Sequence, residues 1–109
     1  MLIYGPWPEI QHSVCSSIMY IVYVLESKKD SKMYIGYTKN LRKRIEEHNE
    51  GLNTSTKSRT PFKLIYFEGC IEEKDAKRRE NYLKTTPGRK FLGLRMREYN
   101  RLKKLGSEC

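Results

Sequence analysis

The sequence predicts a small α/β domain in which a three-stranded, mostly antiparallel sheet is flanked by helices in the order β-β-α-β-α-α. Short β-branched and aromatic runs indicate the strands. Apolar residues at helical spacing indicate the helices that separate and follow them. The chain has 109 residues, and a chain of this length buries roughly two-thirds of its unfolded surface in one modest core. We therefore expect a single domain.

The first two predicted strands form a β-hairpin. Residues 19–25 are a β-branched and aromatic run of strand length, and residues 33–37 form a second run. The polar and charged residues 28–32 between them are typical of a turn. Residues 62–67, again rich in aromatic and aliphatic side chains, predict the third strand.

The first predicted helix follows the hairpin. Thr38 or Asn40 can cap its start near Leu41, because their side-chain oxygens accept hydrogen bonds from free amides of the first turn. Gly51 suits its end, since glycine readily adopts the left-handed backbone that terminates many helices.

Two more helices are predicted towards the C-terminus. Residues 72–84 indicate the second, and Thr86-Pro87 indicates the capped start of a third that runs through Leu102. At the other end, closely spaced prolines without periodicity mark residues 1–18 as an irregular leader, and the sequence leaves open whether it belongs to the folded unit. The expected domain spans residues 19–105.

The charge balance indicates the kind of partner. Lysine and arginine number 22 against 13 acidic residues, a net charge of +9. Such an excess is typical of a protein that binds a polyanion. An acidic membrane surface is the weaker candidate, because no segment joins a basic face to a wide apolar face. No apolar run approaches the ~20 residues that span a bilayer. Nucleic acid is therefore the predicted partner.

The cysteines indicate the compartment. Cys15, Cys70 and Cys109 contain no C-x-x-C pair. An odd number without metal-ligand spacing argues against a disulfide framework and against a zinc site. The first residues also lack the basic and apolar regions of a secretory signal. We expect a reducing, cytoplasmic environment.

Arg44 and His48 are the first candidate functional residues. They are four apart on the first helix, so they share one face, and that face overlaps the edge of the apolar stripe marked by Leu41, Ile45 and Leu52. A guanidinium and an imidazole that lean towards the core can serve a site. The structural alternative is an arginine with a buried stem and a histidine at the edge of the core.

Glu80 lies on the apolar stripe of the second helix, between Ala76 and Leu83. A buried, unpaired carboxylate costs several kcal/mol, so it needs a cation. Arg79 or Arg44 can supply one as a structural ion pair. The functional alternative is a divalent ion such as Mg²⁺, which takes carboxylate oxygens together with water and substrate phosphate.

Tyr23 and Tyr34 lie on the two strands of the predicted hairpin, where they come close to facing positions. Gly36 beside them leaves room for the backbone of a substrate. The structural alternative is an aromatic core with the hydroxyl groups at its rim.

Together these residues form an ordered set. It comprises Ile21-Val22-Tyr23, Tyr34-Ile35-Gly36, Leu41-Arg42-Lys43-Arg44, His48 and Glu80. The set resembles the GIY-YIG nuclease family, in particular its small stand-alone members, which are similar to the nuclease module of the bacterial excision-repair endonuclease. The likeness covers residues 19 to about 92. Ile21 stands where the first motif of the family has glycine, and the asparagine found late in some members has no assigned counterpart.

The resemblance implies the fold described above and a metal-dependent endonuclease. Glu80 would hold one Mg²⁺ or Mn²⁺, and Arg44 would bind the non-bridging phosphate oxygens. Tyr23 would orient or deprotonate the attacking water. Tyr34 would hydrogen-bond in the same cluster, and His48 would relay a proton or hold Tyr23.

The predicted substrate is duplex or branched DNA, and RNA stays open. No element resembles a base-reading helix, so we expect weak sequence preference and recognition of DNA structure, as in repair or recombination. A monomer or a weak dimer is expected. The predicted phosphate contacts are Lys39, Arg42, Lys43, Lys57, Arg59, Arg78 and Lys90.

Two other functions are compatible with the composition. A non-catalytic nucleic-acid-binding module would keep the basic face and bind without cutting. A structural adaptor would use the leader and the third helix for a protein partner. The complete set of candidate catalytic residues favours the nuclease over both.

Overall fold

The computed structural model describes residues 19–53 and 56–106. The leader predicted for residues 1–18 lies outside them, so that prediction stays untested. The elements are β1 (Tyr20–Ser27), β2 (Met33–Thr38), α2 (Leu41–Asn49), the 3-10 turn η1 (Lys57–Arg59), β3 (Phe62–Cys70), α3 (Glu73–Leu83), α4 (Thr86–Arg95) and α5 (Arg97–Lys104).

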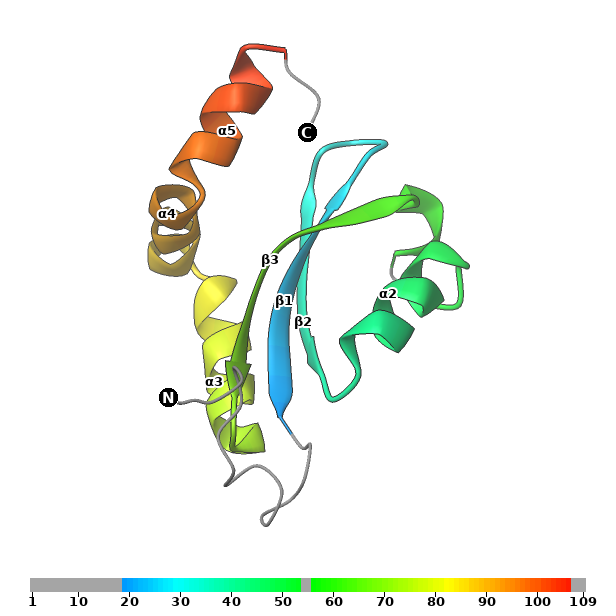
Figure 1. The fold of residues 1–109 in the computed structure, drawn as a ribbon, viewed down its shortest axis with the longest axis vertical. Helices are drawn as coiled ribbons and strands as arrows, with labels where there is room; N and C mark the ends of the chain where they lie inside the picture. Colours follow the sequence, from blue (N-terminus) through cyan, green and yellow to red (C-terminus); the bar gives the residue numbers. More distant parts are fainter. Residues whose placement is uncertain (1–18, 54–55, 107–109) are drawn as a thin grey trace, which may run out of the picture.

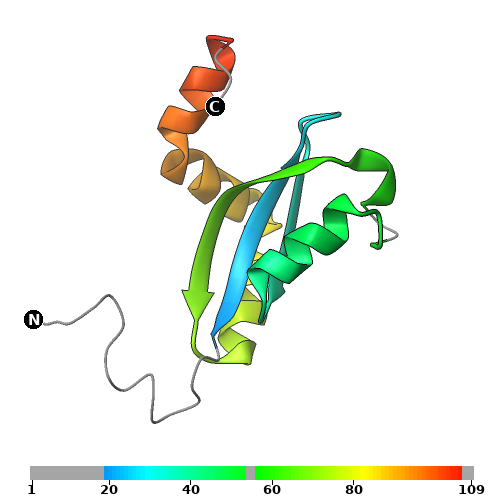
Figure 2. The ribbon, with the colours of Figure 1, turned by 45° about the vertical axis from the view of Figure 1, so that its right-hand side comes forward.

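The three strands form one antiparallel sheet in the order β2-β1-β3, so β1 is central and the other two are edges. Figure 1 shows α2 on one side of this sheet and α3 and α4 on the other, and the turned view of Figure 2 shows the same layers. The predicted α/β class and mostly antiparallel sheet are confirmed.

The face of the sheet towards α3 and α4 carries the larger apolar core. Side chains alternate between the faces along a strand, and on β1 and β2 this alternation sends Val22, Val24 and Ile35 to this side. Helical spacing on α3 and α4 supplies the facing residues. These are Ala76, Leu83 and Leu92, and Met96 closes the core just beyond α4.

The opposite face, under α2, carries a smaller cluster. Tyr23, Leu25 and Phe62 are buried there. Leu41 and Ile45 of α2 pack against them, as their spacing predicted. Leu52, predicted on the same stripe, is 68% exposed because α2 has already ended.

The ends of α2 follow the sequence closely. The Asn40 side chain accepts a hydrogen bond from the Lys43 amide at 3.1 Å and caps the helix, while Thr38 Oγ1 accepts from the Asn40 amide. Gly51, just after the helix, has φ = +77°, the left-handed conformation expected there.

The single third helix predicted from Thr86 is wrong. Thr85 is the cap, and the helix breaks at Met96, so α4 and α5 are separate elements. Met96 is buried in the core. The turn there directs α5 so that Tyr99 and Lys103 both reach the buried carboxylate of Glu26 on β1.

Within the described ranges, no helix combines the length and the apolar character needed to cross a bilayer.

Candidate active site

The two candidate tyrosines share the α2 face of the sheet. The β1–β2 register pairs Tyr23 with Gly36 and pairs Tyr34 with Leu25. Tyr23 and Tyr34 are therefore diagonal neighbours, not directly facing residues, and their ring centroids are 6.3 Å apart.

Gly36 has a different role from the predicted one. A Cβ atom at this position would lie 2.6 Å from the Tyr23 Oη and 2.9 Å from its Cζ. The space beside the glycine is therefore filled by the phenol of Tyr23, and the expected room for a substrate backbone is not there. Glycine at this position lets the Tyr23 ring lie across β2.

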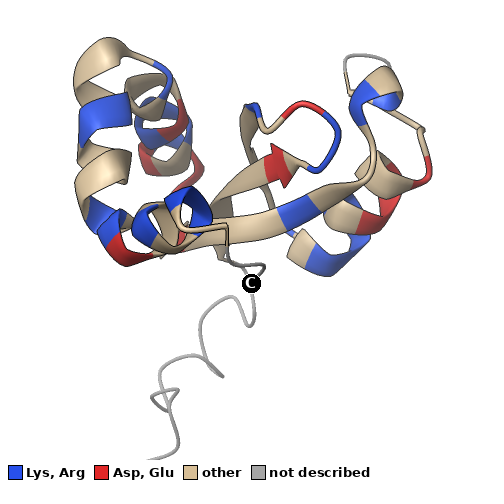
Figure 3. Cartoon of the chain, turned by 90° about the horizontal axis from the view of Figure 1, so that it is seen from above, with Lys and Arg blue, Asp and Glu red and all other residues tan. Residues whose placement is uncertain are grey.

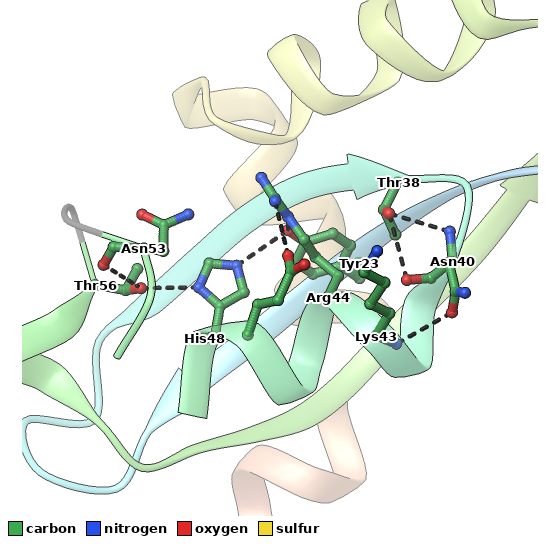
Figure 4. Close-up of polar contacts among 9 residues, drawn as sticks. Tyr23, Thr38, Asn40, Lys43, Arg44, His48, Asn53 and Thr56 are labelled. Atoms are coloured by element: carbon green, nitrogen blue, oxygen red, sulfur yellow. Dashed lines mark hydrogen bonds and ion pairs between the residues drawn. The ribbon is translucent and has the colours of Figure 1, made fainter. Parts of the chain in front are cut away.

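His48 is completely buried, with 0% exposure, so the alternative of a histidine at the edge of the core is wrong. Its Nε2 lies 3.2 Å from Tyr23 Oη and its Nδ1 lies 2.8 Å from Thr56 Oγ1, as Figure 4 shows. The Tyr34 ring packs against the imidazole at a centroid distance of 4.8 Å. One residue of α2 is thus held from β1, from β2 and from the loop after α2.

Four polar side chains form a continuous series of contacts. Arg44 Nε donates to Tyr23 Oη at 3.4 Å, and the same phenol oxygen lies 3.2 Å from His48 Nε2. Thr56 Oγ1 donates to the Asn53 carbonyl at 3.4 Å and lies 2.8 Å from His48 Nδ1. The result is a continuous path Arg44–Tyr23–His48–Thr56, in which the imidazole is neutral.

Burial governs the acidity of this path. Burial lowers the pKa of His48 from its ordinary value, and the nearby Arg44 charge lowers it further. Burial raises the pKa of Tyr23 and outweighs the opposing hydrogen bond from Arg44. At neutral pH the site therefore holds a neutral phenol next to a neutral imidazole.

Arg44 connects the buried path to solvent. Its side chain is 39% exposed, and its Nη1 donates to Glu47 Oε1 at 3.2 Å. The contacts with Tyr23 and Glu47 hold the guanidinium between the buried residues and solvent. Such a planar cation suits the oxygens of a phosphate.

Glu80 lies on α3, across the sheet from the other four candidates. Its carboxylate is 16% exposed and pairs with Lys84 at 3.0 Å. The predicted structural partners are wrong, since Arg79 pairs instead with Glu68, at 2.8 Å. No hydrogen bond among the described residues joins Glu80 to the other four candidates.

The charge of Glu80 nevertheless reaches the site. The pKa of Tyr23, raised mainly by burial, is raised further by this carboxylate. The pKa of Tyr37, raised by its hydrogen bond to Glu73 and by burial, is also raised by Glu80. The Tyr37 hydroxyl also donates to Glu73 at 3.1 Å, so α3, which carries Glu80, contacts the edge strand β2.

The donor set fits one weakly held divalent ion. In the part of the chain that the structure describes, no group of three His, Cys, Asp or Glu side chains comes together. A single carboxylate such as Glu80 suits Mg²⁺, which keeps several waters and binds through one or two carboxylates plus phosphate. Its i,i+4 partner Lys84 is 47% exposed and can move into solvent.

The predicted phosphate contacts are divided between the two helix layers (Figure 3). Lys39, Arg42 and Lys43 are exposed at the start of α2, and Lys57 is exposed in η1. Arg78 of α3 and Lys90 of α4 are exposed on the other layer.

Arg59 is occupied within the protein. It pairs with Asp30 at 3.3 Å and lies over the Phe62 ring at 5.5 Å. Arg78 also has a partner, Asp75, at 3.0 Å. These contacts reduce the charge that either arginine offers to a ligand.

Sequence reasoning missed Thr56 and Lys84. Thr56 lies in a polar loop eight positions after His48, and a single sequence offers no signal that its hydroxyl is buried. Lys84 was identifiable in principle, because it stands four residues after Glu80 on a helix, the spacing of an ion pair.

The chain matches known proteins over its described region. Residues 19–93 match the family model of the GIY-YIG catalytic domain. A UPF0213 protein of Clostridium perfringens is 45% identical over 67 residues, which cover 61% of this chain and 71% of the relative. A UPF0213 protein of Staphylococcus saprophyticus is 38% identical over 74 residues, covering 67% and 89%.

A solved structure is also similar. It is the solution NMR structure of a UPF0213 protein from Bacillus halodurans, with 31% identity, a TM-score of 0.44, and coverage of 69% of this chain and 82% of that one. The family match extends over more than half of the chain and includes every strand. The chain therefore belongs to the GIY-YIG catalytic domain family.

Proposed function

We propose that this protein is a divalent-metal-dependent endonuclease that hydrolyses phosphodiester bonds of DNA. Its family supports a nuclease. The observation that carries the proposal is the buried path Tyr23–His48–Thr56 with the partly exposed Arg44 at its open end. A buried, neutral histidine bonded to a phenol is an arrangement for moving a proton at neutral pH.

Water activation is assigned to Tyr23 and His48 acting in series. The attacking water gives a proton to Tyr23 Oη while the phenol proton passes to His48 Nε2. Tyr23 ends neutral and His48 ends as an imidazolium. A phenolate is never required, which agrees with the raised pKa of Tyr23. The water oxygen then bonds to phosphorus, the P–O3′ bond breaks, and its electron pair leaves with the 3′ oxygen.

Arg44 is assigned to the non-bridging oxygens of the phosphate, where charge develops as the water attacks. Tyr34 is assigned to orient the water or the phosphate. Its ring is fixed against His48, and no hydrogen bond occupies its hydroxyl among the described residues. Both groups then act within the same cluster.

Nucleases of this family generally use divalent metal ions. In this chain Glu80 would hold Mg²⁺ or Mn²⁺, which would neutralise phosphate charge and assist the leaving oxygen. The substrate phosphate would lie over the β2 edge, between Arg44 on one layer and Glu80 on the other. The effect of the Glu80 charge on Tyr23 and Tyr37 supports this position.

The substrate we propose is duplex or branched DNA, recognised by structure with weak sequence preference, in repair or recombination in the cytoplasm. The net charge of +9 supports a nucleic acid. The prediction of weak sequence preference rests on the sequence, in which no helix resembles one that reads DNA bases. RNA oligonucleotides belong in the same assay, and a monomer or weak dimer is expected.

The test is strand scission of supercoiled plasmid and of a branched oligonucleotide, with and without Mg²⁺ or Mn²⁺. Glu80→Gln should abolish scission. Its matched control is Glu98→Gln, which removes an i,i+3 ion pair with Arg101 on α5 and should leave cutting intact. Metal-dependent scission by Glu80→Gln would refute the metal assignment.

The Lys84→Ala variant, assayed at several Mg²⁺ concentrations, tests the metal site further. It removes the cation that competes with the metal for Glu80, so half-maximal cutting should need less Mg²⁺. If wild-type protein binds DNA but cuts nothing under any of these conditions, the chain is a non-catalytic nucleic-acid-binding module.

A further inference from the structure

Thr56 holds its hydroxyl in an unusual place for a residue at the start of a helical turn. It is the N-cap of η1, a position where a threonine oxygen normally accepts a bond from a free amide of the first turn. Here the side chain makes no such capping bond. The residue is 0% exposed, and its Oγ1 contacts His48 Nδ1 at 2.8 Å. The Thr56 hydroxyl therefore hydrogen-bonds to the His48 imidazole instead of capping the turn.

The loop that carries Thr56 is anchored to both of its neighbours. At its end, Asn49 Nδ2 donates to the Phe62 carbonyl at 3.3 Å, and the Phe62 amide donates to Asn49 Oδ1 at 2.7 Å. Within it, the Thr56 amide donates to the Asn53 carbonyl at 3.1 Å and the Arg59 amide donates to the Thr56 carbonyl at 2.9 Å. These bonds hold the Thr56 backbone on both sides, through its amide and its carbonyl.

The Asn53 carbonyl decides the direction of the hydrogen bond. It accepts the Thr56 hydroxyl proton at 3.4 Å, which leaves the Oγ1 lone pairs facing His48. An imidazole next to an acceptor at Nδ1 carries its proton there and presents a bare Nε2 on the other side. That bare nitrogen faces Tyr23 Oη at 3.2 Å.

We propose that Thr56 is a positioning residue that fixes His48 as the Nδ1–H tautomer, so that Nε2 is free to take the Tyr23 proton. The inference rests on the proposed nuclease function for its consequence, but the tautomer is a property of the free protein. In the opposite tautomer Nε2–H would donate to Tyr23 Oη, and the phenol proton would have no acceptor in the path.

The first measurement is the ¹⁵N NMR spectrum of the His48 ring in the full chain at neutral pH. Wild-type protein should show a protonated, pyrrole-type Nδ1 and an unprotonated, pyridine-type Nε2. Thr56→Ser keeps a hydroxyl and should preserve this pattern. Thr56→Val has nearly the same shape without the hydroxyl, and it should shift the ring towards Nε2–H. An Nε2–H tautomer in the wild type would overturn the proposal, even if Thr56→Val fails to fold.

The second measurement is cleavage by the same three proteins. Thr56→Val should lower kcat by at least on the order of a hundredfold, the usual contribution of a positioned acid–base group, with KM unchanged, and Thr56→Ser should restore most of it. A folded Thr56→Val protein with the altered tautomer and wild-type kcat would refute the positioning role. If the wild type does not cut, the nuclease proposal fails while the NMR pattern still decides the tautomer.

Discussion

The two faces of the sheet differ in the kind of side chain that they bury. The face under α3 and α4 is an apolar core built from residues such as Val24, Ile35 and Leu83. The face under α2 buries a histidine, a tyrosine and a threonine that are linked by hydrogen bonds. Strand alternation places Tyr23 on the α2 side and Val24 on the other, while α2 and the loop after it add His48 and Thr56 to the polar cluster.

Stability and chemistry therefore depend mainly on opposite faces of the sheet. Apolar packing contributes most of the folding free energy, whereas buried polar groups contribute little net stability and mainly fix geometry. The buried series Tyr23–His48–Thr56 therefore depends on the position of β1, which carries Tyr23 and is stabilised by apolar packing on its opposite face. Substitutions on the two faces should separate folding from activity.

The largest expected effect is on the α3 side. Leu83→Ala removes a completely buried side chain from the apolar core and should lower the free energy of unfolding by about 2–5 kcal/mol. Urea denaturation measures it. Leu94→Ala is the control. Leu94 is on α4, in the same helix layer as Leu83, but it is exposed, so this change should alter stability little. Equal losses for both would mean that this face is not the stabilising core.

The next effect is on the α2 side. Gly36→Ala places a methyl group 2.6 Å from Tyr23 Oη, so the phenol must move away from His48. We expect a loss of about 1–3 kcal/mol in unfolding free energy from overpacking, together with loss of strand scission. Thermal unfolding and the plasmid assay measure the two effects.

Gly93→Ala on α4 is the matched control for this change. A methyl group there meets nothing within 4 Å, and alanine in a helix interior is favoured over glycine by about 0.5–1 kcal/mol. The variant should be slightly more stable and fully active. Normal cutting by Gly36→Ala would show that the position of the Tyr23 ring does not matter for the reaction.

The sequence predicts these two faces with different success. Local patterns are enough for the three strands, the Asn40 cap and the end of α2 at Gly51, because each depends on neighbouring residues. The break at Met96 is invisible in the sequence, since a buried methionine continues the apolar spacing and the contacts of Tyr99 and Lys103 with Glu26 join residues far apart in the chain. Tertiary contacts decide that element.

The same limit applies to the site. The motif spacing leads to Tyr23, Tyr34, Arg44 and His48, which the structure brings together; their catalytic roles remain predictions. The filled space at Gly36 and the contact from Thr56 depend on ring and loop positions that one sequence does not encode locally. The sequence analysis pairs Glu80 with Arg79 or Arg44, whereas its partner is Lys84, one helical turn later on α3.

A smaller effect concerns pH. Folding lowers the pKa of His48 from 6.5 through burial and the charge of Arg44, although Glu47 opposes this. The native state therefore prefers the neutral ring, and protons bind more readily to the unfolded chain. Stability from this residue is complete above pH 6.5 and declines as the pH falls below it. The midpoint of the acid loss of strand scission should likewise lie below pH 6.5.

His48→Gln is the reference for that measurement. Urea denaturation at several pH values should show a steeper loss of stability in wild type than in the variant between neutral pH and about pH 5, where few carboxylates titrate. An acid limit of cleavage above pH 6.5 would contradict a buried, neutral histidine as proton acceptor.

The smallest expected effect compares the basic residues of the two helix layers. Each phosphate contact on duplex DNA changes the slope of log K against log salt by about 0.9. Lys39→Ala with Lys43→Ala should flatten this slope by close to twice that amount, because both residues are exposed beside Arg44 on the layer of the site. Arg78→Ala with Lys90→Ala should flatten it less, since these residues lie across the sheet and Arg78 is already paired with Asp75.

Binding titrations over a range of salt concentrations measure both slopes. Equal changes would mean that the DNA contacts the exposed surfaces of α3 and α4 as strongly as it contacts α2, which would contradict a substrate held mainly on the α2 layer and over the β2 edge.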